Sequence, residues 1–292
     1  MSRAAVIDVG TNSVKFLLVE DGHTVVDRSE ITRLGQGARD DGRLASESIG
    51  RTVDAIAAMV QEAGEARIAA VGTAGLRRAP NRAELIGAVR ERAGVDVEVI
   101  SGDEEARLSY MATKSALGLT GNVVVFETGG GSTQFTYGRD RRIEEQFSVD
   151  VGAARVTERW HLDGPVGEDV VAEALAGIDD ELGRVHAGGD AVVGMGGAVT
   201  NLAAVKHGLA EYDPDAIQGT VLDTAEIDRQ IELYRTRTAD ERRSLPGLQP
   251  KRAEVILAGA CIVRAVLARL GGDSLTVSDR GLRHRLIVER FG

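Results

Sequence analysis

The feature that most constrains the fold is an internal repeat. The segment AAVIDVGTNSVKFLLVED at 4–21 aligns without gaps with VVVFETGGGSTQFTYGRD at 123–140. The aligned pairs include Asp8 with Glu127, Gly10 with Gly129, and Ser13 with Ser132. Each copy reads as a buried strand, an acid, a turn of small residues and a second strand, and a third strand follows. Two copies of this unit, each followed by helices, predict two similar domains that face each other.

The rest of the chain alternates between strand and helix patterns, which indicates α/β layers with partly parallel sheets. We predict third strands at 23–31 and 142–149, and a helix from residue 200 onward. The glycines at 118–121 suggest a boundary that gives an N-terminal domain of residues 1–120 and a C-terminal domain of residues 121–292. Whether the closing helix packs back on the first domain stays open.

Composition excludes several classes of partner. The formal net charge is −10 and no basic stripe is visible, which argues against nucleic acid or a membrane as the main partner. No run of about 18 apolar residues predicts a membrane span. Asp8 interrupts the first apolar run too early for a signal peptide, and the single cysteine, Cys261, cannot form an internal disulfide. We therefore expect a cytoplasmic protein.

The two repeated turns are candidate phosphate sites, because a turn without bulky side chains exposes backbone N–H groups that bind anions. The acid before each turn, Asp8 or Glu127, would carry a divalent cation such as Mg²⁺ that bridges phosphate oxygens. The alternative is two tight hairpins in which glycine serves conformation alone. The predicted phosphate-binding residues of the two turns are Gly10, Thr11, Asn12, Ser13, Gly129, Gly130, Gly131, Ser132 and Thr133.

A third glycine segment, VVGMGGAVT at 192–200, reads as a strand, a glycine turn and a helix N-terminus. Gly196 and Gly197 would then bind another phosphate. Close packing of the helix on the strand explains these glycines nearly as well.

The segment SGDEEARL at 101–108 opens a predicted helix. Ser101 with Glu104 has the spacing of a capping box, and Asp103 with Arg107 has the spacing of an ion pair. Neither feature uses Glu105, which makes this residue the candidate general base.

Arg77 follows a loop of small residues, GTAGL, after a predicted strand. A guanidinium in this position suits bidentate phosphate binding. The alternative is a solvated pair formed by Arg77 and Arg78. No cluster of His, Cys and carboxylates has zinc spacing, and no Ser-His-Asp arrangement is visible.

Several motifs, taken in order, resemble the exopolyphosphatase/guanosine pentaphosphate phosphohydrolase (Ppx/GppA) family of the actin-like, ribonuclease H-like ATPase superfold. The likeness covers nearly the whole chain and fits the short, two-domain form of the family. It implies two actin-like domains that flank a cleft. The motifs are AVIDVGTNS, GTAGLRRAPN, VISGDEEARLSY, FETGGGSTQ, VVGMGGAVTNLAA, PKRAEVILAG and VSDRGLRHRLI.

The resemblance also implies an activity and roles for single residues. Glu105 would activate the attacking water, Asp8 and Glu127 would be the acids associated with Mg²⁺ or Mn²⁺, and Arg77 would contact phosphate. The two glycine turns would hold phosphates. The implied reaction is hydrolysis of terminal phosphoanhydride bonds of polyphosphate, with release of orthophosphate.

Two departures from the family motifs keep alternatives open. Glu127 stands where the family has Asp, and Gln134 stands where it has Glu. The alternatives are hydrolysis of guanosine pentaphosphate or another nucleotide, and a non-catalytic sensor of polyphosphate or an alarmone. A sugar or acetate kinase is a weaker option, because the EEAR segment argues against it. A homodimer is an option that no residue demonstrates.

Overall fold

The computed structural model describes residues 3–37 and 41–292, which form two compact units. The first unit contains the described residues up to Ala112 together with Gly281–Gly292, and the second contains Thr113–Arg280. We predicted a boundary at residue 120, whereas the division falls inside a continuous helix, α4 (Gly102–Leu117). No glycine or proline interrupts this helix to mark the division. In the part of the chain that the structure describes, no helix is both long and apolar enough to cross a membrane.

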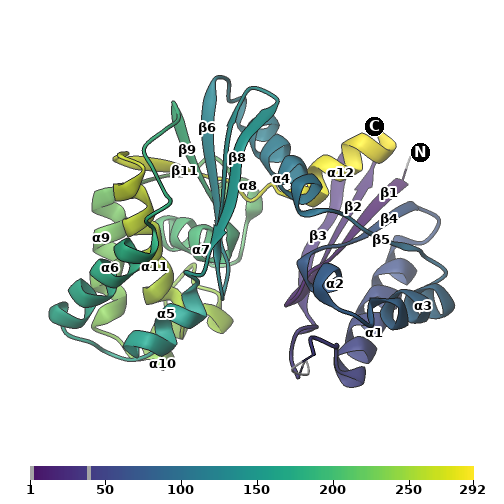
Figure 1. The fold of residues 1–292 in the computed structure, drawn as a ribbon, viewed down its shortest axis with the longest axis horizontal. Coiled ribbons are helices and arrows are strands. Elements are labelled where there is room, and N and C mark those ends of the chain that lie inside the picture. The colour runs from purple at the N-terminus through teal and green to yellow at the C-terminus, as the bar shows by residue number, and fades with distance from the viewer. Residues whose placement is uncertain (1–2, 38–40) are drawn as a thin grey trace. The chain divides into compact units, whose positions relative to one another are not determined.

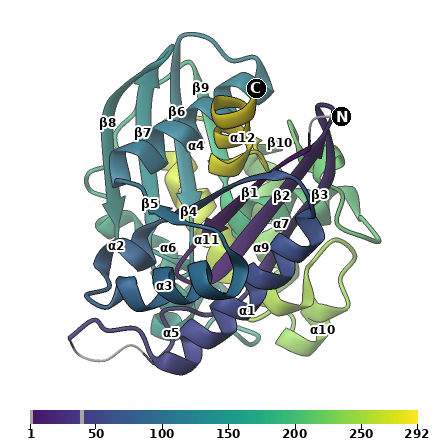
Figure 2. The ribbon, with the colours of Figure 1, turned by 90° about the vertical axis from the view of Figure 1, so that its right-hand side faces the viewer.

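The first unit contains a five-stranded sheet with the strand order β3-β2-β1-β4-β5. β1, β2 and β3 are antiparallel neighbours and lie side by side in Figure 2, whereas β4 and β5 continue the sheet in parallel with β1. Besides α4, its elements are β1 (Arg3–Val9), β2 (Ser13–Glu20), β3 (His23–Ile31), α1 (Ser46–Ala63), β4 (Arg67–Gly72), α2 (Ala74–Arg78), α3 (Arg82–Ala93), β5 (Val97–Val99) and α12 (Leu282–Phe291).

Helices cover both faces of this sheet. Ala5, Ile7 and Val9 of β1 pack in one core with α1 and α3, which lie together in Figure 1. Ala4 and Val6 point to the opposite face, where they pack in a second core with α4 and α12. This alternation is the period of two that an extended strand imposes on its side chains.

The second unit contains a six-stranded sheet with the order β10-β11-β9-β6-β7-β8. Its most deeply buried helix is α11, which packs against α5, α6, α7 and α9. Within α11, burial raises the pKa of the Cys261 thiol to about 12. The elements are β6 (Asn122–Thr128), β7 (Thr133–Arg139), β8 (Arg142–Val149), α5 (Ala153–Trp160), α6 (Glu168–Glu181), β9 (Ala191–Met195), α7 (Gly196–His207), α8 (Pro214–Ile217), β10 (Val221–Asp223), α9 (Thr224–Arg235), α10 (Ala239–Arg243), η1 (Pro250–Arg252), α11 (Ile256–Arg269) and β11 (Ser274–Val277).

The internal repeat is confirmed in three dimensions. Each copy forms a three-stranded antiparallel meander, and the predicted third strands are β3 and β8. The register shifts after Leu18 in the first copy and after the equivalent Tyr137 in the second. The equivalent turn residues Asp21 and Asp140 both adopt a left-handed backbone, with φ of 48° and 51°. The two copies therefore share local irregularities as well as their strand pattern.

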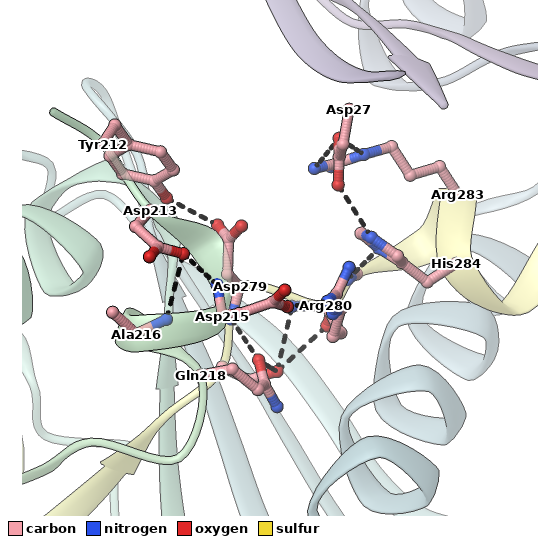
Figure 3. A network of polar contacts seen from close by, with 12 residues as sticks. Asp27, Tyr212, Asp213, Asp215, Ala216, Gln218, Asp279, Arg280, Arg283 and His284 are labelled. Carbon is pink, nitrogen blue, oxygen red and sulfur yellow. Dashed lines mark hydrogen bonds and ion pairs between the residues drawn. The ribbon is translucent and has the colours of Figure 1, made fainter. Parts of the chain in front are cut away.

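The C-terminal helix α12 is tied to β3 by a buried carboxylate (Figure 3). Asp27 accepts a bond from Nε of Arg283 at 2.8 Å and lies 2.9 Å from Nε2 of His284. Nδ1 of His284 accepts the N–H of Gly281 at 3.1 Å, so Nε2 carries the proton and donates to Asp27. Burial alone would raise the pKa of Asp27, but the hydrogen bond from His284 and the charge and hydrogen bond of Arg283 outweigh it and lower that pKa.

Candidate active site

The first predicted acid, Asp8, lies next to the carboxyl end of β1. Its buried side chain belongs to the same face of the sheet as Ala4 and Val6, because side chains alternate along the strand. Lys15 stands directly opposite on β2, with Nζ 3.8 Å from Oδ2 of Asp8. The carboxylate thus lies at the entrance of the first turn with a cation beside it.

The first turn, 10–13, is fixed through its backbone. The N–H of Gly10 donates to the carbonyl of Ser13 at 3.0 Å. The carbonyls of Thr11 and Asn12 accept N–H bonds from the loop that follows β3. These backbone bonds hold the turn in place, and the polar residues Thr11 and Asn12 are exposed.

The candidate base and the predicted phosphate-binding arginine contact each other. Nη1 of Arg77, on α2, donates to Oε2 of Glu105 at 2.7 Å and to the carbonyl of Ile100 at 3.1 Å. Glu105 lies in the first turn of α4, and both side chains are partly exposed. Within the described residues, the N–H groups on Nε and Nη2 of Arg77 have no hydrogen-bond partner. Arg77 can therefore orient Glu105 and still offer donors to an anion.

The remaining residues of this segment serve the helix. Oγ of Ser101 accepts the N–H of Glu104 at 3.1 Å, as the predicted N-cap requires. The carboxylate of Glu104 forms two bonds of 2.8 Å with Arg107. Arg107 thus pairs with Glu104, and also with Glu289 of α12, instead of with Asp103. The acid of this segment that contacts Arg77 is therefore Glu105.

The second predicted acid, Glu127, occupies the equivalent position on β6. It is partly buried and lies opposite Gln134 on β7, as Asp8 lies opposite Lys15 in the first copy. The second copy therefore has a neutral amide where the first copy has a cation.

The second turn repeats the backbone bond of the first, because the N–H of Gly129 donates to the carbonyl of Ser132 at 2.9 Å. The carbonyls of Gly129 and Gly130 accept the first N–H groups of α5, and residues 129–131 are exposed. Gly152 approaches this turn so closely that an added Cβ would lie 2.4 Å from three of its backbone atoms. Only a glycine at position 152 allows this contact.

Thr133 does not supply the hydroxyl donor that we predicted. Its side chain is buried, and Oγ1 donates to the carbonyl of Val151 at 2.6 Å. Thr133 begins β7, and its side chain points into the unit. Its hydroxyl therefore connects the start of β7 to the chain just after the end of β8. The exposed part of this turn is residues 129–131.

The third glycine segment begins α7 four residues earlier than the predicted helix. Gly196 has a φ of 87°, and an added Cβ would lie 2.8 Å from the carbonyl oxygen of Thr128. An added Cβ on Gly197 would lie 2.4 Å from Nη2 of Arg252. The first glycine is thus needed by the backbone, and the second allows a guanidinium to approach the first turn of the helix.

Arg252 is the residue of this region that the sequence analysis did not select. Among the described residues, its guanidinium has no hydrogen-bond or ion-pair partner, and burial lowers its pKa. The positive end of the α7 dipole makes this an unfavourable place for a cation without an anion. In the sequence its neighbours Lys251 and Glu254 give it the look of a surface residue. It lines a small cavity together with Thr128, Gly129, Ala153, Ala198, Val255 and Ile256.

The carboxylates fit a divalent cation that is held partly by its substrate. Within the described residues, no group of three or more His, Cys, Asp or Glu side chains could hold a metal ion. Asp8 and Glu127 are each a single carboxylate at the end of a strand. Mg²⁺ is commonly bound by one or two carboxylates, with waters and substrate phosphates as its other ligands. The donor set therefore fits this mode and does not fit a closed structural site.

The site combines a duplicated unit of strand, acid and glycine turn with a Glu–Arg pair and a cation at a helix N-terminus. Together these features define a phosphate-handling protein built from two α/β domains of the actin-like ATPase superfold. The model of the Ppx/GppA phosphatase family matches residues 17–291. The chain belongs to this family, and it is a phosphoanhydride hydrolase.

Individual relatives agree with this assignment. Exopolyphosphatase 2 of Mycobacterium tuberculosis is 33% identical, and the alignment covers 100% of this chain and 99% of that protein. Exopolyphosphatase 1 of Mycobacterium bovis is 29% identical over 99% of this chain and 88% of its own length. A crystal structure of the Ppx/GppA phosphatase of Aquifex aeolicus, the type II variant, matches with a TM-score of 0.88 and 32% identity over 100% of both chains. The ethanolamine utilization protein EutJ of Carboxydothermus hydrogenoformans shares the fold alone, with a TM-score of 0.50 and 13% identity.

Proposed function

We propose that the protein hydrolyses the terminal phosphoanhydride bonds of inorganic polyphosphate and releases orthophosphate. The observation that supports an anionic substrate most strongly is Arg252, a partly buried cation at the N-terminus of α7 whose guanidinium has no hydrogen-bond or ion-pair partner among the described residues. The exposed glycine turn at 129–131 lies beside the same cavity. The exopolyphosphatase relatives support polyphosphate as the anion.

Glu105 takes the proton of the attacking water. A carboxylate is a suitable base only if its position is fixed, and the 2.7 Å bond from Arg77 supplies this restraint. As phosphoryl transfer proceeds, negative charge is spread over the oxygens of the transferred group. The remaining N–H groups of Arg77 stabilise that charge.

In each unit the backbone turn binds phosphate. The exposed Thr11 and Asn12 and the hydroxyl of Ser13 serve this role in the first unit, and the amides of residues 130–132 serve it in the second. Asp8 and Glu127 would hold Mg²⁺ or Mn²⁺, which neutralises phosphate charge when it is bound.

Phosphate release from long-chain polyphosphate by the purified protein tests this function. Glu105→Gln keeps the size of the side chain and an oxygen that can accept from Arg77, so it should lower kcat by about 10²- to 10⁴-fold and leave the Kd for polyphosphate nearly unchanged. The matched control is Glu104→Gln, because this neighbouring acid bonds to Arg107. It should retain most of the activity.

The same assay with guanosine pentaphosphate separates the two substrates that the family name covers. Faster turnover of polyphosphate supports the proposal, and faster turnover of guanosine pentaphosphate replaces it. Binding of polyphosphate without any release, in the presence of Mg²⁺ or Mn²⁺, would contradict catalysis and leave a sensor.

A further inference from the structure

Arg252 lies in a short segment that is held at both ends by buried polar side chains. The segment consists of Gln249, the 3-10 helix η1 and Ala253. Inside it, the N–H of Arg252 donates to the carbonyl of Gln249 at 2.8 Å. Three residues of 3-10 helix provide little stability of their own, because their hydrogen-bond geometry is poor. The position of the Arg252 guanidinium therefore depends on what fixes the ends of the segment.

Asn201 of α7 fixes the first end. Its side chain is fully buried. Oδ1 accepts the N–H of Gln249 at 2.8 Å, and Nδ2 donates to the carbonyl of Gly197 at 2.8 Å. One carboxamide thus connects the start of the segment to the same glycine that Arg252 approaches.

Arg242 of α10 fixes the second end. It is fully buried, and its guanidinium donates to the carbonyl of Ala253 at 3.3 Å. Its other bonds go to the carbonyls of Tyr234, Leu162 and Gly164, at 2.8 to 2.9 Å. Every one of these acceptors is a neutral carbonyl, and burial lowers the pKa of Arg242.

A buried cation whose acceptors are all neutral is costly. The planar fork of arginine, with five N–H groups in fixed directions, is suited to joining several backbone segments at once. A lysine has the same charge but cannot reproduce these directions. The residue type therefore indicates that Arg242 joins these backbone segments, of which Ala253 is one.

We propose that Asn201 and Arg242 are positioning residues that hold Arg252 against the first turn of α7. This inference rests on the anion-binding role proposed for Arg252. Neither Asn201 nor Arg242 lines the cavity. The inference therefore predicts that both residues affect anion affinity only through Arg252.

The test is a set of double-mutant cycles on the full chain, with the Kd of sodium tripolyphosphate measured by calorimetry. Arg242→Lys and Asn201→Ala should each raise the Kd by about 3- to 30-fold. In the Arg252→Met background, the same changes should leave the Kd as it is in Arg252→Met alone. The matched control is Gln230→Ala, since Gln230 is a buried amide that donates to the carbonyl of Leu202 at 2.8 Å without touching the segment. It should lower the melting temperature and leave the Kd unchanged.

The outcomes are distinguishable. Equal losses of affinity with and without Arg252 would show general damage to the unit and overturn the inference. An unchanged Kd in Arg242→Lys and Asn201→Ala, beside a raised Kd in Arg252→Met, would also overturn it. An unchanged Kd in Arg252→Met would show that Arg252 does not bind the anion, and this inference would fall with it. Polyphosphate turnover by the unaltered protein tests the proposed function separately. If Arg242→Lys does not fold, the Asn201→Ala cycle decides alone.

Discussion

Replacing Arg252 by methionine should change stability and anion binding in opposite directions. Methionine keeps the unbranched apolar stem and removes the cation that burial and the α7 N-terminus both disfavour. A misplaced charge at a helix end costs about 0.3–1 kcal/mol. For a unit that spans Thr113–Arg280, a gain of about 1 kcal/mol in the free energy of unfolding raises the melting temperature by roughly 2–4 °C.

The same Arg252→Met change should weaken the binding of the anion. A hydrogen bond to a charged group contributes about 1.5–3 kcal/mol, so the Kd of tripolyphosphate should rise by roughly 10- to 150-fold. A ligand at concentration L that binds only the folded state stabilises it by RT ln(1 + L/Kd), so a higher Kd gives less stabilisation at the same ligand concentration. The melting temperature of Arg252→Met should therefore start higher than that of the unaltered protein and increase less when tripolyphosphate is added.

Thermal melts in an anion-poor buffer, with and without tripolyphosphate, check both parts. Arg243→Met is the control, because Arg243 is an exposed neighbour that pairs with Asp240 and Glu254. It should leave the ligand-induced shift unchanged. A lower starting temperature for Arg252→Met together with a full ligand shift would refute the reasoning and make Arg252 a structural residue.

Three further changes test other parts of the site. Arg77→Ala removes the restraint on Glu105 and a phosphate donor, so steady-state kinetics should show a lower kcat and a higher KM; unchanged constants would return Arg77 to a solvated role. Gly152→Ala places a Cβ 2.4 Å from backbone atoms of the 129–132 turn, so we expect a lower melting temperature and a KM raised by more than about tenfold; a variant with normal values would show that the turn can move at little cost. The folded-state pKa of Asp27 lies below its ordinary value of 3.8, so its stabilising contribution is complete above pH 3.8 and is lost as the pH falls through the folded-state pKa. Denaturant titrations between pH 2 and 6 should show a larger loss of stability below pH 3.8 in the unaltered protein than in Asp27→Asn, and equal losses would exclude Asp27 as a cause.

The parts of the fold that follow from local pattern could be predicted from the sequence. The repeat gave β3 and β8 with their observed bounds, because alternating side chains and a tight turn fix the register of a hairpin. The start of α7 was placed four residues too late. Gly196 and Gly197 have low helix propensity, so the sequence does not mark them as helical, although the close approach of the Thr128 backbone explains the glycine at 196.

The parts of the site that depend on tertiary burial could not be predicted. Arg252 lies between Lys251 and Ala253 in the sequence, and only the fold brings its partly buried guanidinium against Gly197 in the first turn of α7. Thr133 looked like a donor because a hydroxyl beside glycines is a common phosphate ligand, yet its strand turns the hydroxyl inward to Val151. The elimination that selected Glu105 holds only in part: Ser101 accepts the N–H of Glu104, but Arg107 pairs with Glu104 and Glu289 and not with Asp103.

The residues opposite the two duplicated acids differ in charge, and this difference affects how strongly each acid attracts a cation. Asp8 has the ammonium of Lys15 at 3.8 Å, so this pair is close to neutral. Glu127 faces the uncharged Gln134 in the second copy, so it has no cation at the position that Lys15 occupies in the first copy. A divalent cation is attracted to a local negative charge and repelled by a neighbouring ammonium. If Asp8 and Glu127 hold the cation as proposed, these charges predict that Glu127 contributes more to the affinity for the cation than Asp8 does.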